Sequence, residues 1–165
     1  MNAKDAILTN FAMADRLAET YTSDLTDEEL LVRPVESQNH IAWQLGHLIV
    51  TSHRILNRIR PGASPALPEG FEAHHGREEG APASDDATHF RSRAEYLALW
   101  KAQRDAVKAV VADLSDEELD APGPEPLRRL VPTVGTSLLF LACHELMHIG
   151  QFVGVRRKLN KPVLI

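Results

Sequence analysis

The chain has 165 residues, enough for a domain that buries a hydrophobic core without disulfides, so we treat residues 1–165 as one domain. Its 23 acidic residues outnumber its 18 basic residues, and the formal net charge is −5. A nucleic-acid-binding surface needs clustered lysine and arginine, so this charge argues against a nucleic acid partner.

The single cysteine, Cys143, excludes an intramolecular disulfide and a cysteine-based zinc cluster. We interpret it as a small buried hydrophobic residue. The chain opens without a basic and apolar leader, and its apolar runs are shorter than the roughly 18 residues of a membrane span. We therefore expect a soluble, cytoplasmic protein with no membrane partner.

Four segments carry apolar residues at the spacing of three and four that predicts amphipathic helices. The first spans about residues 3–22, the second 38–59, the third 92–113 and the fourth 134–159. Thr133 is placed to cap the start of the fourth segment, and Asn160 and Pro162 are placed to end it. The pattern predicts an all-α fold built as a four-helix bundle.

Two similar stretches, residues 24–30 and 113–119, follow the first and third helices. Each contains a capping box, formed by Thr26 with Glu29 and by Ser115 with Glu118, which predicts a short helical turn. Two interpretations stay open: a repeated helix-and-turn unit, and two ordinary helix starts.

The connection over residues 60–91 is long and rich in proline, glycine and alanine. Antiparallel neighbours in a bundle need only about two to eight connecting residues, so this length predicts a crossover that leaves the second and third helices parallel. The crossover is interpreted either as a lid over a site or as a loose surface excursion. Its histidines, His74, His75 and His89, are expected at the surface, with a lid histidine near a metal site as the alternative.

His144 and His148 lie four residues apart in the fourth helix, so both imidazoles project from one face. Two neighbouring imidazoles can bind one ion at the roughly 2.0–2.1 Å that zinc requires. The same face carries the apolar Leu141 and Val155, and imidazoles buried among apolar residues need partners. Gln151, one turn beyond His148, is a candidate catalytic residue that hydrogen-bonds a ligand or an imidazole.

His47 lies in the middle of the second helix and is the candidate third ligand, because bundles build metal sites from facing helices. Gly46 beside it is a poor helix former, which we interpret as a sign of close helix packing. Three protein ligands with open positions are typical of a catalytic metal site. A hydrogen-bonded core histidine is the equally open alternative for His47.

Three further residues on the second helix have simpler interpretations. His40 lies seven residues before His47 and could line a cavity, whereas His53 is expected to face solvent. Arg54 is interpreted as a surface arginine, with contact to an anionic group as the alternative.

Residues 144–148 also spell H-E-x-x-H, the zinc-protease motif in which Glu145 would be the general base. Residues 149–165 contain no histidine, aspartate or glutamate to serve as a further ligand, which argues against this interpretation. Glu145 is then either a carboxylate that supports the metal ligands or an exposed side chain.

Two sequence stretches resemble the DinB-like superfamily, which includes the YfiT-type proteins. Residues 39–48, NHIAWQLGHL, resemble its second helix, and residues 144–151, HELMHIGQ, resemble its fourth. The resemblance spans nearly the whole chain in helix order, including the long crossover. It implies an up-down-down-up four-helix bundle that is commonly a homodimer.

The resemblance also implies a mononuclear site of three histidines, which fall here on His47, His144 and His148. Members of the superfamily bind zinc, nickel, iron or manganese, and this ligand set does not discriminate among them. The implied function is a metal-dependent enzyme with a small-molecule substrate, and we favour an S-transferase with a low-molecular-weight thiol as cosubstrate. A metal-dependent hydrolase and a non-catalytic metal or small-molecule binding module are the alternatives.

Overall fold

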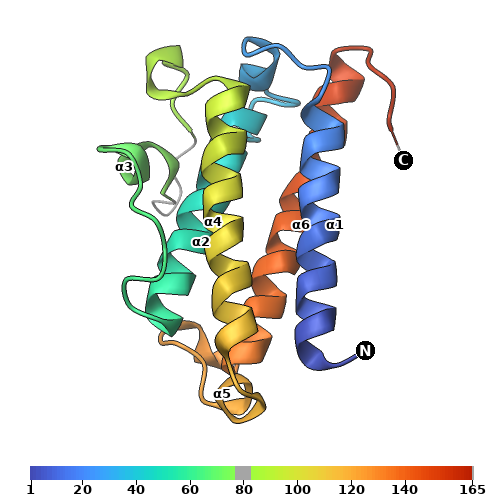
Figure 1. Cartoon of the computed structure of the whole chain (residues 1–165). Coiled ribbons are helices and arrows are strands. Elements are labelled where there is room, and N and C mark those ends of the chain that lie inside the picture. Colours follow the sequence, from blue (N-terminus) through green and yellow to red (C-terminus); the bar gives the residue numbers. More distant parts are fainter. Residues whose placement is uncertain (77–82, 165) are drawn as a thin grey trace.

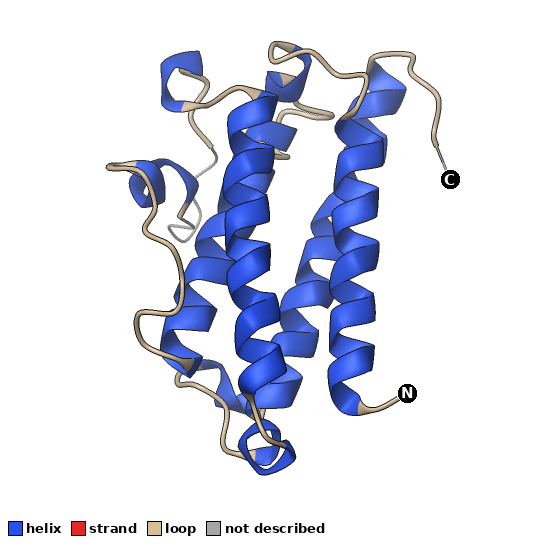
Figure 2. Ribbon diagram, in the orientation of Figure 1, coloured by secondary structure: helices blue, strands red, loops and turns tan. Residues whose placement is uncertain are grey.

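Four long helices run side by side in the computed structural model, which describes residues 1–76 and 83–164 (Figures 1 and 2). They are α1 (Ala3–Thr22), α2 (Ile41–Ile59), α4 (Arg93–Asp113) and α6 (Val134–Lys158). In Figure 1 the chain runs up α1, down α2, down α4 and up α6, so α2 and α4 are parallel. This arrangement confirms the predicted four-helix bundle with a crossover between its second and third helices.

Side-chain caps define where the long helices begin. Asn2 and Ser92 each form a capping box before α1 and α4. Helix α2 begins at Ile41, later than the predicted residue 38, because His40 is its N-cap: the His40 Nδ1 accepts a hydrogen bond of 3.1 Å from the Trp43 backbone N–H. His40 is therefore a capping residue.

The two repeated acidic stretches both form the short turns that were predicted. They are η1 (Glu29–Leu31), a 3₁₀ helix, and α5 (Asp116–Asp120), an α-helix. Both capping boxes are present in the structure. Leu30 and Leu119, at equivalent positions of the two stretches, are both buried and attach each turn to the bundle.

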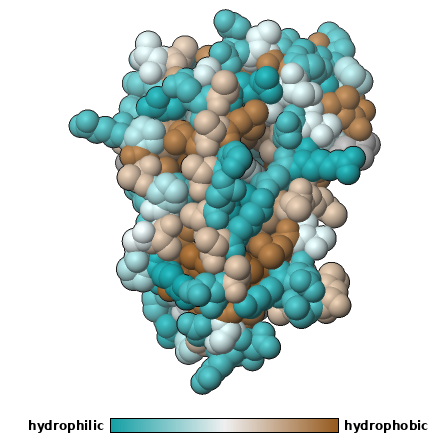
Figure 3. Space-filling view, viewed as in Figure 1, coloured by the Kyte–Doolittle hydropathy of each residue, from teal (hydrophilic) through white to brown (hydrophobic). Residues whose placement is uncertain are grey.

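Helix α6 is one of the four bundle helices and contributes a buried face to the core. In length and composition it resembles a membrane-spanning helix, but Leu138, Leu141 and Phe152 are fully buried against the other helices. Cys143 is exposed on α6, so its assignment to the core is wrong: its position on the helix faces solvent. On the face presented by α1 and α4, hydrophilic side chains are interspersed with apolar ones (Figure 3).

The described part of the crossover is packed against the bundle. It includes α3 (Phe71–His75) and η2 (Ala87–His89), and a further 3₁₀ turn, η3 (Leu127–Arg129), precedes α6. Helix α3 contacts α2. His75, which was expected at the surface, is only 1% exposed. The surface prediction for His75 is wrong because its imidazole lies directly over Gly46 of α2.

The N-cap of α2 makes the bundle sensitive to acid. Burial lowers the pKa of His40 from 6.5 to about 4. Because Nδ1 accepts from Trp43, the imidazole proton is on Nε2, which lies 3.4 Å from the Ser84 carbonyl oxygen. The unfolded chain therefore takes up this proton near pH 6.5 and the folded chain only near pH 4, so stability falls as the pH drops through this interval.

We predict that His40→Asn reduces the loss of stability at acidic pH, because an asparagine still caps the helix but does not titrate. Between pH 6.5 and 4 the wild type should lose about 3 kcal/mol more unfolding free energy than the variant, measured by urea denaturation. His89→Asn, which removes a partly exposed imidazole, is the control and should follow the wild type. Equal pH dependence in wild type and His40→Asn would refute the assignment.

A candidate metal centre

Three histidines from two helices meet at one point of the bundle. His47 comes from α2, and His144 and His148 come from α6; one ring nitrogen of each lies within 4.8 Å of the others. The ring centroids are 5.4 Å apart for His47 and His144, 5.2 Å for His47 and His148, and 4.7 Å for His144 and His148. All three side chains are half-buried. The structure thus brings the three predicted ligands together.

Two of the imidazoles are oriented through their Nδ1 nitrogens. The His47 Nδ1 lies 3.3 Å from the His75 carbonyl oxygen, and the His148 Nδ1 lies 3.1 Å from the Gln44 Oε1. The Gln44 amide is oriented because its Nε2 donates to the Asn39 carbonyl oxygen at 2.9 Å. Since both acceptors are carbonyl oxygens, each imidazole donates from Nδ1 and carries its lone pair on Nε2, the form that binds a metal.

Aromatic side chains one helical turn earlier stack on two of the histidines. Trp43 lies over His47 with ring centroids 4.8 Å apart and an angle of 6° between the rings. Phe140 lies over His144 at 5.7 Å and 11°. Both stacks limit ring rotation. Sequence reasoning missed Phe140 and Gln44, although their spacing of four from His144 and three from His47 was a readable signal.

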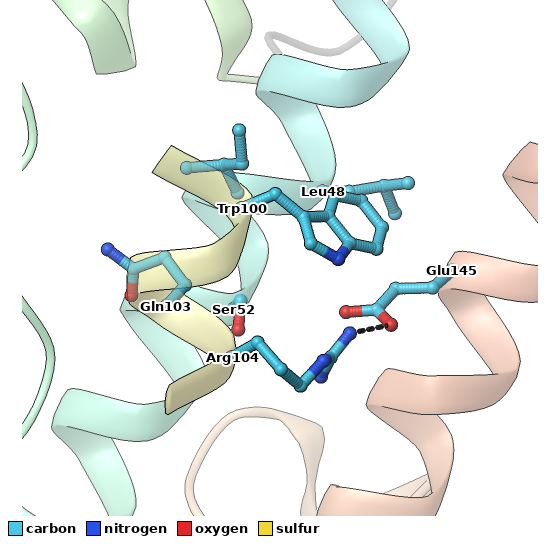
Figure 4. A pocket seen from close by; sticks show the side chains of 7 residues that line it. Leu48, Ser52, Trp100, Gln103, Arg104 and Glu145 are labelled. Carbon is cyan, nitrogen blue, oxygen red and sulfur yellow. Dashed lines mark hydrogen bonds and ion pairs between the residues drawn. The ribbon is translucent and has the colours of Figure 1, made fainter. Parts of the chain in front are cut away.

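Glu145 points at α4, as Figure 4 shows. Its Oε2 accepts a hydrogen bond of 2.5 Å from the Arg104 Nη2, and both side chains are 3% exposed. Burial raises the pKa of Glu145, an effect that Arg104 opposes. The carboxylate is thus committed to an ion pair between α4 and α6. This contact argues against its predicted alternative role as the general base of a zinc protease.

The Glu145–Arg104 pair belongs to a network that joins three helices. The Arg104 Nε donates to the Asp15 Oδ1 of α1 at 2.7 Å, and the Trp100 Nε1 donates to the same oxygen at 2.7 Å. The guanidinium carbon lies 4.0 Å from the centre of the Phe11 ring. A cavity of about 10 Å³, room for roughly one water molecule, adjoins the pair (Figure 4).

The remaining predicted residues lie around the site in different ways. Gln151 is exposed on α6, and its role toward a ligand stays a prediction. Arg54 is a surface residue that pairs with Glu72 of α3 at 3.1 Å. His53, which was expected to face solvent, is half-buried: its Nδ1 lies 2.8 Å from the Ser64 Oγ at the start of the crossover.

Comparisons with known proteins agree with this architecture. A family model described as the DinB superfamily matches residues 11–152. The crystal structure of a conserved protein from Enterococcus faecalis superposes with a TM-score of 0.74 at 16% identity, covering 98% of this chain and 99% of that chain. No curated protein sequence matches the chain.

A second similar structure is YfiT from Bacillus subtilis, described as a probable metal-dependent hydrolase with an unusual four-helix bundle topology. It superposes with a TM-score of 0.70 at 14% identity, covering 96% of this chain and 89% of that chain. At these identities the two structures establish the fold.

We predict that Glu145→Ala destabilises the bundle by about 3 kcal/mol or more in urea denaturation, because it leaves the buried Arg104 without one of its carboxylates. The metal content of the folded protein should stay near that of the wild type. Glu117→Ala, which truncates an exposed carboxylate on α5, is the control. A stability loss below about 1 kcal/mol would show that the pair is not the structural link proposed here.

Proposed function

Since the chain belongs to the DinB superfamily, we propose that His47, His144 and His148 bind one divalent metal ion at the centre of an enzyme that acts on a small molecule. The convergence of the three imidazoles carries this proposal. Nitrogens bound to one tetrahedral ion at about 2.1 Å lie about 3.4 Å apart, so small ring rotations suffice to close the triad. Zinc, nickel, iron and manganese all suit imidazole ligands.

Three neutral imidazoles leave the charge of the ion undiminished and its remaining positions open. When bound, such an ion lowers the pKa of a thiol or a water molecule that reaches it. The half-buried position of the triad leaves a path for a small molecule to approach. The Nδ1 hydrogen bonds of His47 and His148 hold their rings in place for this role.

For the reaction itself we favour the transfer of a low-molecular-weight thiol. Among the described residues, the group suited to a metal consists of histidines alone, and Glu145 is engaged by Arg104. A thiol at a metal is deprotonated outright, whereas zinc-protease hydrolysis uses a carboxylate as general base. The sulfur would bond to an electrophilic carbon, the leaving group would depart with the electron pair, and the thiol proton would pass to solvent.

A metal-dependent hydrolase is the second candidate, because the structurally similar YfiT is described as a probable one. A non-catalytic metal-binding module is the candidate from a different class. We also propose a cytoplasmic homodimer without nucleic acid or membrane partners.

We predict that His144→Ala abolishes stoichiometric metal binding. Purified wild type should contain about one divalent ion per chain by inductively coupled plasma mass spectrometry, and the variant about a tenth of that or less, because two imidazoles bind far more weakly than three. His89→Ala, which removes a histidine outside the triad, should retain the wild-type content. Equal metal content in wild type and His144→Ala would remove the site.

We further predict that the wild type conjugates monobromobimane with at least one low-molecular-weight thiol. The rate should fall about tenfold or more in His144→Ala and after metal removal by a chelator, because thiol activation depends on the ion. Metal-dependent cleavage of model esters without thiol conjugation would instead support the hydrolase. Metal binding without either activity would favour the binding module.

A further inference from the structure

We propose that the crossover between α2 and α4 is a structural part of the metal centre: His75 of the crossover, and Asn39 just before α2, which the crossover residue Ala83 contacts, act as positioning residues that hold His47 and His148 in their metal-binding orientation. The inference rests on the proposed function, since it assigns the support of the same three ligands. It gives the long connection a role other than those of a lid or a loose excursion.

The first contact reaches His47 from α3. The carbonyl oxygen of His75 lies 3.3 Å from the His47 Nδ1. His75 is the last residue of α3, and the last carbonyl groups of a helix have no partner within that helix. The end of α3 is therefore a natural acceptor for the imidazole N–H of His47.

The side chain of His75 anchors that carbonyl group. Its Nδ1 donates to the Phe71 carbonyl oxygen at 2.8 Å, and its Nε2 accepts from the Tyr96 hydroxyl of α4 at 2.7 Å. The Tyr96 oxygen itself accepts from the Arg91 backbone N–H at 3.3 Å, so the hydroxyl proton is directed to His75. The imidazole thus ties α3 to α4 with both nitrogens used.

Gly46 gives His75 the space for this anchor. A Cβ atom added at Gly46 would lie 1.9 Å from the His75 Cδ2 and 2.4 Å from its Cγ. Gly46 directly precedes His47. Any larger residue at position 46 would therefore displace the His75 imidazole, which lies over α2. Glycine inside a helix costs about 1 kcal/mol relative to alanine, and this contact explains its presence. The close packing expected at Gly46 exists, but its partner is α3 of the crossover.

The second contact reaches His148 through the Gln44 side chain and the backbone and side chain of Asn39. The Gln44 Oε1 accepts from the His148 Nδ1, and the Gln44 Nε2 donates to the backbone carbonyl oxygen of Asn39. The Asn39 Oδ1 accepts from the Ala83 backbone N–H at 2.9 Å. Arg33 reinforces this link, since it donates to both the Asn39 Oδ1 and the Ala83 carbonyl oxygen. Crossover residues before and after residues 77–82 therefore support candidate ligands: His75 contacts His47, and Ala83 is linked through Asn39 and Gln44 to His148.

The test is Gly46→Ala, which displaces His75 without touching a candidate ligand. We expect the zinc dissociation constant, measured by competition with a chromophoric chelator, to rise about 10- to 100-fold. In the metal-free protein at about pH 8, ¹⁵N–¹H correlation spectra should show wild-type His47 protonated at Nδ1 and a mixture of tautomers in the variant. Gly150→Ala is the matched control: it lies on α6 two positions after His148, and its added Cβ meets nothing within 4 Å.

A second variant, Tyr96→Phe, adds no volume and removes only the hydroxyl group that holds His75. It should weaken zinc binding in the same direction by about three- to tenfold, and it decides the question if Gly46→Ala does not fold. Wild-type zinc affinity together with an unchanged His47 tautomer in these variants would overturn the positioning role while leaving the metal site intact. If the wild type binds no zinc, the proposed function fails, and the His47 tautomer still tests the contact with His75.

Discussion

An imidazole that binds a metal ion through Nε2 almost always donates its Nδ1 hydrogen to an acceptor, and the surroundings of His47 and His148 follow from this requirement. Backbone carbonyl groups inside an α-helix are already paired within the helix. A bundle of four long helices therefore offers few acceptors beside a central histidine. The chain supplies them in two ways, with the Gln44 side chain for His148 and with the carbonyl group of His75 for His47.

Neighbouring positions of helix α6 carry polar side chains with two different roles. His144 and His148 meet His47 of α2, whereas Glu145 is buried against Arg104 of α4. Successive residues of a helix point about 100° apart, so one turn of α6 can serve the candidate site and the core at the same time. The motif H-E-x-x-H therefore has a different meaning here from that in a zinc protease, where glutamate and histidines serve one reaction.

Much of this arrangement is predictable because it depends on local sequence. Helix bounds follow from apolar periodicity and capping boxes, and the spacing of His144 and His148 places both on one face. The surface assignment of His75 and the core assignment of Cys143 are wrong for a common reason. Each depends on which face meets a partner distant in sequence, and neither composition nor periodicity encodes that partner.

The length of the crossover is explained by the same requirement. A parallel α2 and α4 already demand a connection that returns along the whole bundle, and lengthening a flexible loop costs little additional entropy, about 0.6 kcal/mol per doubling. Within that connection, one short helix ends beside α2, and its last carbonyl group is not paired within the helix. The carbonyl groups in the middle of a long bundle helix are paired within that helix. Gly46 lets this helix approach closely enough for the contact. The long connection and Gly46 both depart from a simple bundle, and both serve the same contact with His47. The connection provides the carbonyl group of His75, and Gly46 provides the space for His75 to approach.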